Sequence, residues 1–452
     1  MTDTRSLEAQ AEQVLRDVIH YVVEQGGSLS VVDSPPGAGK TGLTERCVAA
    51  AVLAARMRVC CVTPKAEQSI DLARRIASAY QLPSIQLLMA GSRTVPANLP
   101  AGLQVINDVG AIGPGPGVVI STVDKIAVHI DRLPANSFDL LIADEAYQMS
   151  FAQFLPVADL APRVLLVGDP GQLPPLVRAD TSQYEAATTR VHWPAPKQIL
   201  NQYPSARRFM LPATRRFSQD TVEIIQPHLY PDLPFQSLAR PEDRRLRLVA
   251  AGMGGIVDRA LDAIAGGASM VAIELPARAP CLNDVDIELA NTIAAVVHRT
   301  LERGPEWVGH RGLSTADIGC IDPHVASGGA IRAELRRLGR GGVFVDTPEI
   351  WQGSQAPVMV VRHPLSGCFD PSEFDLQAGR LCVTLSRHQV ACIIVARANV
   401  GQVLEQYRHD CGKAISGAED SCWRGYRAHA GVWDSLSARG RVFADPAEAL
   451  VA

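Results

Sequence analysis

Several features that would place a protein in a special class are missing from this 452-residue chain. It has no apolar run of about eighteen residues and no apolar core after its polar start at residues 1–5, so we expect neither a membrane-spanning helix nor a signal peptide. A cytoplasmic location without membrane partners follows as an expectation. Its ten cysteines include no C-x-x-C pair, which favours reduced core cysteines. A zinc site of His409, Cys411, Cys422 and His429 stays open as an alternative, although its spacing matches no zinc pattern.

A strongly basic surface is missing too. The net charge is −4, the pI is near 6.3, and lysine occurs at only five positions. This balance gives no global attraction to nucleic acid but leaves room for a local basic groove. Apolar residues make up 47% of the chain and charged residues 20%, which is typical of a globular protein. The length exceeds the size at which a single core stops growing, so we expect two large domains and a small extension.

The order of the segments predicts an α/β fold. Strand-like runs alternate with helical patterns up to a proline-rich stretch at residues 171–212, and the pattern then restarts without a second glycine-rich loop. Such alternation indicates parallel sheets with helices on both faces. The expected domains are residues 1–205 and 206–400, with an extension at 401–452 that reads as helical with a short final strand.

A glycine-rich loop follows the first apolar run. Residues 31–41 read VVDSPPGAGKT and lead into an alanine-rich helical pattern. Backbone N–H groups around Gly37, Ala38 and Gly39 can hold phosphates, Lys40 can reach the β- and γ-phosphates, and Thr41 can ligate Mg²⁺. The pattern G-x-x-x-x-G-K-[ST] has Ser34 where its first glycine is expected. We therefore expect ATP or GTP to bind here.

A second signal is a run that ends in two carboxylates. Residues 138–146 read FDLLIADEA, a buried parallel strand followed by Asp144 and Glu145. At the carboxyl end of a strand beside the phosphate loop, Asp144 can hold magnesium and Glu145 can act as the base for the attacking water. An acidic turn after a core strand is the alternative interpretation.

A third run is another strand-like segment that ends in a polar turn. Residues 164–175 read VLLVGDPGQLPP, in which Gln172 is placed to sense the γ-phosphate. A phosphate loop, then Asp-Glu-Ala, then Gly-Asp-x-x-Gln-Leu-Pro-Pro resembles motifs I, II and III of the superfamily 1 helicases, in the 1B form of RecD-like and nonsense-mediated-decay-type enzymes. Further segments resemble the family's other motifs in the expected order: 62–65 (Ia), 120–123 (Ib), 211–217 (the arginine motif), 318–324 (the next central strand), 346–354 (V) and 380–387 (VI).

The resemblance implies two tandem RecA-like domains with ATP and Mg²⁺ in the cleft between them. The second domain then supplies the arginine fingers Arg216 and Arg387, with Arg215 as a rival to Arg216, while Gly353 of motif V senses the γ-phosphate. Gln13 is the candidate for reading adenine, and an exposed glutamine on an amphipathic helix is the alternative.

The resemblance also implies an ATPase stimulated by single-stranded DNA or RNA, with 5′-to-3′ polarity. It assigns phosphate contacts along the strand to Thr63, Pro64, Ser121, Thr122 and Thr347. Trp351 and His324 are candidates for base stacking, and packing is the alternative for Trp351. Few residues separate motifs Ib and II, so no large wedge subdomain fits there, and a protein partner is expected for strand separation or loading. The alternatives are a clamp or scaffold that does not unwind, or another phosphate-loop enzyme such as a kinase or GTPase.

Overall fold

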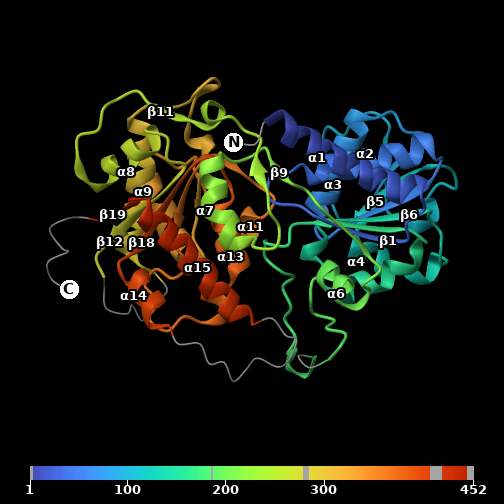
Figure 1. Ribbon diagram of the computed structural model, residues 1–452. Coiled ribbons are helices and arrows are strands. Elements are labelled where there is room, and N and C mark those ends of the chain that lie inside the picture. Colours follow the sequence, from blue (N-terminus) through green and yellow to red (C-terminus); the bar gives the residue numbers. More distant parts are fainter. Residues whose placement is uncertain (1–3, 185–186, 278–284, 408–419, 445–452) are drawn as a thin grey trace. The chain divides into compact units, whose positions relative to one another are not determined.

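The computed structural model describes residues 4–184, 187–277, 285–407 and 420–444. The chain forms two compact units (Figure 1). The first contains residues 1–170 and 174–213, and the second contains residues 171–173 and 214–452.

The first unit is built on one parallel sheet. Its eight strands lie in the order β4-β3-β5-β2-β6-β7-β1-β8, and every neighbouring pair is parallel. The strands are β1 (Leu29–Asp33), β2 (Arg58–Thr63), β3 (Ile85–Leu88), β4 (Leu103–Ile106), β5 (Gly117–Thr122), β6 (Leu140–Asp144), β7 (Val164–Gly168) and β8 (Arg207–Met210).

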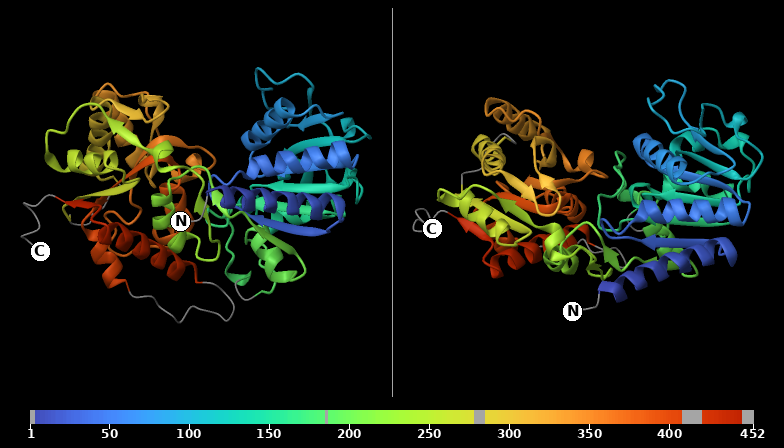
Figure 2. Two further views of the ribbon diagram at one scale, coloured as in Figure 1. Left: turned by 45° about the horizontal axis from the view of Figure 1, so that its top comes forward. Right: turned by 90° about the horizontal axis from the view of Figure 1, so that it is seen from above.

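Alternate residues of these strands enter two cores, one on each face. Val32 and Cys61 belong to one core, and Val31 and Cys60 to the other, as the two-residue period of a strand requires. The first core is covered by α1 (Thr4–Ile19), α2 (Lys40–Ala49) and α3 (Ala66–Ala79), which lie side by side in Figure 2. The second is covered by α4 (Val123–Ala127), α5 (Phe151–Phe154) and α6 (Ala195–Gln202). Burial on both faces explains why the strands read as continuous apolar runs.

The second unit repeats this plan with six parallel strands in the order β16-β15-β17-β18-β12-β19. They are β12 (Met270–Leu275), β15 (Ile318–Ile321), β16 (Phe344–Asp346), β17 (Ala356–Arg362), β18 (His388–Arg397) and β19 (Val442–Ala444). One face packs on α8 (Gly255–Ala265), α9 (Ile287–Glu302) and α10 (Val325–Arg337). The other packs on α7 (Gln219–Leu229), α13 (Ala378–Leu385) and α15 (Ser421–Ala438).

Short elements complete this unit. They are α11 (Pro348–Trp351), α12 (Glu373–Leu376), α14 (Asn399–Gln406), and an antiparallel sheet of β11 (Leu246–Leu248), β13 (Pro305–Trp307) and β14 (Arg311–Gly312). β10 (Gln236–Ser237) pairs with β9 (Ala213–Thr214), which contains the last residue of the first unit and the next residue of the second. The strand expected at 246–250 thus lies in this small sheet.

The α/β class with parallel sheets is confirmed, and two such units are consistent with RecA-like domains. The boundary falls after residue 213, because β8 pairs with β1 and so extends the first sheet past the expected boundary at 205. The described part of 401–452 belongs to the second unit, since β19 pairs with β12. Arg441 also binds both carboxylate oxygens of Asp220 in α7, at 2.6 and 2.7 Å.

The cysteine prediction is confirmed where the structure describes it. Cys60, Cys61, Cys382 and Cys392 are buried and form no disulfide, and burial raises the pKa of the Cys60 thiol to about 12. In the described ranges, no helix is long and apolar enough to cross a lipid bilayer.

Candidate nucleotide site and nucleic-acid interface

The carboxyl ends of neighbouring strands place the predicted nucleotide residues at one edge of the first sheet. β1 leads into the glycine-rich loop, β6 ends at Asp144, and β7 ends just before Asp169. Because these strands are parallel neighbours in the order β6-β7-β1, their carboxyl ends meet at the same edge. Ligands of parallel α/β sheets bind at such edges.

The loop has the backbone that a phosphate site needs. Gly37 and Gly39 have φ angles of +76° and +95°, which side chains other than glycine rarely allow. Gly39 directly precedes α2, so the first N–H groups of that helix open toward the loop. Ser34, the departure from the pattern, is fully buried, and its N–H donates to the Gly168 carbonyl at 2.9 Å. Ser34 therefore ties the loop to the end of β7.

Lys40 faces two carboxylates at this edge. Its Nζ lies 3.5 Å from Oε1 of Glu145 and 3.9 Å from Oδ2 of Asp169, and all three side chains are largely buried. Triphosphate oxygens would compete with these carboxylates for the ammonium group. The geometry thus holds Lys40 at the mouth of the loop between two carboxylates.

Asp144 suits a divalent cation. It is 5% exposed at the end of β6. Burial, with the charge of Glu145 as the next cause, raises the pKa of the Asp144 carboxyl to about 7, and Lys40 opposes this rise. A hard cation would offset the cost of burying this carboxylate, and Mg²⁺ commonly uses one or two protein oxygens together with phosphates and water. The Asp144 carboxylate and the Thr41 hydroxyl, at the start of α2, therefore fit Mg²⁺. No larger metal-ligating cluster occurs among the described residues. His409 and Cys411 of the zinc alternative lie outside them.

Glu145 stands in an unusual conformation. Its φ is +55°, the left-handed region that non-glycine residues seldom occupy. Its N–H donates to Oδ1 of Asp144 at 3.1 Å, and its Oε2 accepts from the Gln148 amide at 3.1 Å. Such strain is retained where the surroundings determine a side chain's direction.

The second unit brings the two predicted arginine fingers together. Arg216 donates from Nη1 to the carbonyl of Ser386 at 2.9 Å, so its guanidinium lies beside Arg387. Arg387 is fully buried, and its Nη1 has no hydrogen-bond partner among the described residues. A buried guanidinium with an unused donor fits an anionic ligand. Arg215, the rival, is exposed.

Gln172 belongs to the second unit by its contacts. Its Oε1 accepts from the Gln352 amide at 3.4 Å. A Cβ built on Gly379 would meet the Gln172 carbonyl at 2.7 Å, so only glycine allows this approach. Gly353, next to Gln352, has a φ of +96°. Motifs III, V and VI therefore meet around Gln172.

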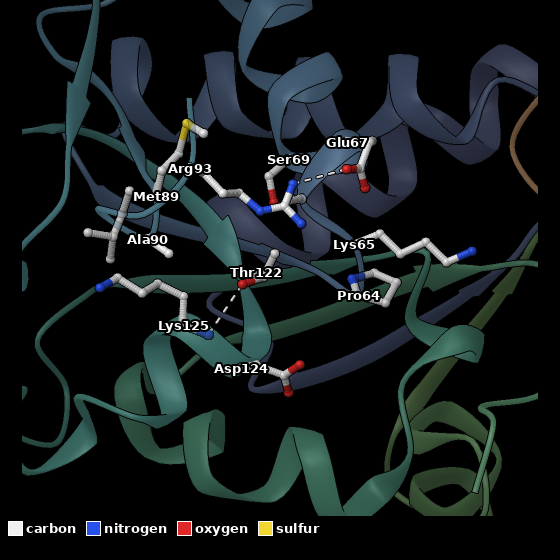
Figure 3. A pocket seen from close by; sticks show the side chains of 12 residues that line it. Pro64, Lys65, Glu67, Ser69, Met89, Ala90, Arg93, Thr122, Asp124 and Lys125 are labelled. Carbon is white, nitrogen blue, oxygen red and sulfur yellow. Dashed lines mark hydrogen bonds and ion pairs between the residues drawn. The ribbon is translucent and has the colours of Figure 1, made fainter. Parts of the chain in front are cut away.

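A hollow of about 320 Å³ opens in the first unit (Figure 3). We call it the basic pocket. Pro64 and Thr122, which were predicted to contact nucleic acid, line it together with the cations Lys65, Arg93 and Lys125. The complete lining is Pro64, Lys65, Ala66, Glu67, Ser69, Leu88, Met89, Ala90, Arg93, Thr122, Asp124 and Lys125. It follows the ends of β2, β3 and β5, at the same sheet edge as the nucleotide residues.

The predicted hydroxyls behave differently from one another. Thr63 is fully buried, and its Oγ1 bonds to the Lys65 carbonyl at 2.9 Å and to Ser69 at 2.6 Å. Ser121 is also buried, and its hydroxyl donates to the Leu88 carbonyl at 2.9 Å. Both hydroxyls thus brace the pocket wall from inside. Thr122 is half-buried and caps α4, and Thr347 occupies the equivalent position before α11.

Gln13 is exposed on α1, and both ends of its amide bond within that helix, to Asp17 at 2.7 Å and Arg16 at 2.9 Å. This matches the alternative of a surface glutamine. Of the two alternatives for Trp351, the structure shows packing: the ring is 3% exposed, packs on Gly319, and donates to the Cys320 carbonyl at 2.9 Å. His324 lies before α10 with its ring 5.8 Å from that of Phe374.

Sequence reasoning missed several side chains at these sites. Asp169 beside Lys40, Gln148 beside Glu145, and the pocket cations Arg93 and Lys125 were not singled out. Asp169 had a usable signal, because it directly follows a buried strand next to the phosphate loop.

Comparisons with known proteins agree with the nucleotide site. Residues 8–192 match the family described as AAA domain. The human 3'-5' exoribonuclease HELZ2 is 25% identical over 302 residues, which are 62% of this chain and 10% of that protein. The chain therefore spans about a tenth of the length of this relative.

Two solved structures of arterivirus nonstructural protein 10 (helicase), one of them a complex with DNA, are 14% and 15% identical. The matches cover 85% of this chain and 63% and 61% of those chains, each with a TM-score of 0.43. The AAA match covers the phosphate loop, Asp144, Glu145 and Asp169, and it supports a place among the phosphate-loop ATPases, the class that includes the superfamily 1 helicases. This match supports ATP hydrolysis as the activity of the chain.

Proposed function

We propose that this chain is an ATP-driven translocase or helicase of the superfamily 1B type, stimulated by single-stranded DNA or RNA and moving 5′ to 3′. One observation carries this proposal: the basic pocket and the nucleotide residues lie on adjacent strands of one parallel sheet. The nucleotide residues, at the ends of β6, β7 and β1, thereby lie along the same sheet edge as the basic pocket, at the ends of β2, β5 and β3. A free-standing kinase or GTPase has no need of that second site.

Each nucleotide residue has a role in this proposal. Lys40 and the loop N–H groups hold the phosphates, and Thr41 and Asp144 hold Mg²⁺, which neutralises charge on the phosphate oxygens when bound. Glu145 accepts a proton from the attacking water. Gln172 and Gly353 sense the γ-phosphate.

Arg216 and Arg387 supply positive charge to the transferring phosphoryl group in this proposal. The buried, unused Nη1 of Arg387 supports the role, because such a donor gains most from an anion. Arginine fingers of this kind contribute roughly 10³–10⁵ in rate.

The basic pocket suits the backbone of a single strand. Its three cations exceed its two carboxylates, Glu67 and Asp124, by one charge, and in Figure 3 Lys65 and Lys125 extend toward opposite sides. Thr122 and Pro64 add a small polar and apolar wall. Contacts of this kind hold phosphates without reading sequence, so the proposal covers both DNA and RNA.

Strand separation requires a wedge, and the described chain offers little for one. Residues 85–106 form β3 and β4, which extend the main sheet. We therefore propose that a protein partner supplies the wedge or the loading function. A clamp that binds nucleic acid under ATP control without stepping is the second candidate, and the same observation favours it.

Displacement of streptavidin from end-biotinylated oligonucleotides distinguishes a translocase from a clamp. A 5′-to-3′ translocase displaces streptavidin from the 3′ end, in the presence of ATP, faster than from the 5′ end. Glu145→Gln, which keeps the shape but removes the base, should abolish displacement. Equal displacement from both ends would refute the polarity, and ATP-dependent binding without displacement would establish the clamp.

A further inference from the structure

A row of hydrogen bonds joins the rim of the basic pocket to Glu145. The Lys65 N–H donates to Oε1 of Gln68 at 3.0 Å. The Gln68 Nε2 donates to Oε1 of Gln148 at 3.2 Å, and the Gln148 Nε2 donates to Oε2 of Glu145 at 3.1 Å. We call this row the glutamine relay. It lies entirely within the first unit.

The ends of the relay fix the direction of both amides. A backbone N–H can only donate, so Gln68 must turn its oxygen to Lys65 and its NH₂ to Gln148. An ionised carboxylate can only accept, so Gln148 must turn its NH₂ to Glu145 and its oxygen to Gln68. Neither amide can flip without breaking a bond at each of its ends. The relay therefore has one arrangement in which all its bonds are made.

One end of the relay lies at the rim of the basic pocket, and the other end is Glu145. Lys65, Ala66, Glu67 and Ser69 line the basic pocket, so Gln68 sits in the turn that forms its rim. At the other end, Gln148 closes the short turn after β6, is 9% exposed, and donates its own N–H to the Glu145 carbonyl at 2.9 Å. Gln148 thus holds both the backbone and the carboxylate of Glu145.

We propose that Gln148 is a positioning residue that sets the Glu145 carboxylate according to the occupancy of the basic pocket. This inference rests on the proposed function. Glu145 is shared between Lys40, at 3.5 Å, and Gln148. Phosphates of a bound nucleotide attract Lys40, and the carboxylate then depends on Gln148. A strand in the pocket contacts the turn that carries Gln68 and so fixes the far end of the relay. Nucleic acid thereby stimulates hydrolysis by holding the base in place for water.

The substitution Gln68→Glu tests the relay with little damage to the helix. A glutamate keeps the oxygen that caps the Lys65 N–H, which is the preferred arrangement at the start of a helix, but it cannot donate to Gln148. At saturating oligothymidylate or oligouridylate we expect kcat to fall roughly tenfold, the order of the Gln148 hydrogen bond to the charged Glu145 that loses its support, with less than about a twofold change in KM for ATP. Saturation removes any effect of the added charge on oligonucleotide affinity.

Gln202→Glu is the matched control. It adds the same charge to the same unit and keeps the oxygen that accepts from the Gln198 amide at 3.2 Å, so stimulation should stay at the wild-type level. Gln148→Met, which is neutral and of similar length, removes the relay from its centre and should lower stimulated kcat as Gln68→Glu does. A purely structural role would instead lower the thermal midpoint and reduce basal and stimulated rates by the same factor.

Stimulation of Gln68→Glu at the wild-type level would overturn the relay while leaving the proposed function intact. If the wild-type protein is stimulated by neither polymer, the proposed function fails. In that case Gln148→Met tests the holding role alone, and an unchanged kcat would overturn that role too.

Discussion

Three buried histidines predict that the second unit loses stability in mild acid. His363, His388 and His429 are at most 1% exposed. Burial lowers the pKa of His388 and of His429 to about 3, and it lowers the pKa of His363 well below its usual range, with the charge of His429 as the second cause. Each of these rings is therefore neutral in the folded protein near neutral pH.

The sign and size follow from proton linkage. In the unfolded chain these histidines have pKa values of about 6.5, so as the pH falls the unfolded state binds protons that the folded state does not. Stability is complete above that pH and decreases as the pH falls toward the folded values. Between about pH 7 and about pH 5.5 each histidine costs about 1.3 kcal/mol, and three together cost about 4 kcal/mol. That is a large share of the roughly 5–15 kcal/mol that stabilises a domain.

Urea unfolding at the two pH values, followed by tryptophan fluorescence, measures this loss. Four of the five tryptophans lie in the second unit, Trp193 being the exception. Trp433 is 5.4 Å, ring to ring, from His363. The variant His429→Leu cannot bind the proton, so its free energy of unfolding should fall by about 1.3 kcal/mol less than that of the wild type over this interval. Equal decreases in the two proteins would refute the neutral, buried state of His429.

Three further changes test individual residues. Arg387→Met should lower kcat by about 10³ or more without lowering the thermal midpoint, because it removes a buried charge whose Nη1 is unpartnered in the described structure. Steady-state kinetics measures kcat and calorimetry measures the midpoint. A loss of stability that accompanies the loss of activity would contradict this prediction. Gly39→Ala places a side chain at a φ of +95°, a backbone conformation that costs a residue other than glycine about 1–2 kcal/mol. It should therefore weaken ATP binding, as measured by calorimetry. Wild-type affinity for ATP would exclude the proposed loop geometry. Lys125→Ala should reduce the slope of log affinity for oligothymidylate against log salt concentration by about 0.7. Lys197→Ala, elsewhere in the same unit, is the control. An unchanged slope for Lys125→Ala would show that Lys125 does not contact the strand.

The nucleotide residues could be placed from sequence because their positions follow from backbone topology. A strand that ends in a glycine-rich loop and another that ends in Asp144 have their carboxyl ends at the same edge once both run parallel in one sheet, here with β7 between them. The sequence could not show β3 and β4, which have four residues each in a stretch broken by glycine and proline. Without those strands, Arg93 could not be placed beside Lys125, because the pocket forms only where β2, β5 and β3 lie next to one another.

Side-chain direction was the second limit. Thr63 and Ser121 lie at the expected ends of their strands, but nearby carbonyls bind their hydroxyls from inside the unit. A motif specifies where a residue lies along the chain and does not specify which of several acceptors its hydroxyl meets. Trp351 shows the same limit, since its ring packs on Gly319, which lies in a strand thirty-two positions earlier in the chain.

Steady-state ATP hydrolysis by the purified protein, alone and with single-stranded DNA or RNA, tests the central claim most directly. The Lys40→Ala variant serves as the control for contaminating activity. The account predicts stimulation of roughly tenfold or more by at least one polymer, which is about 1.4 kcal/mol in the barrier, and its loss in Lys40→Ala. Hydrolysis that responds to neither polymer, or that persists in Lys40→Ala, would contradict it.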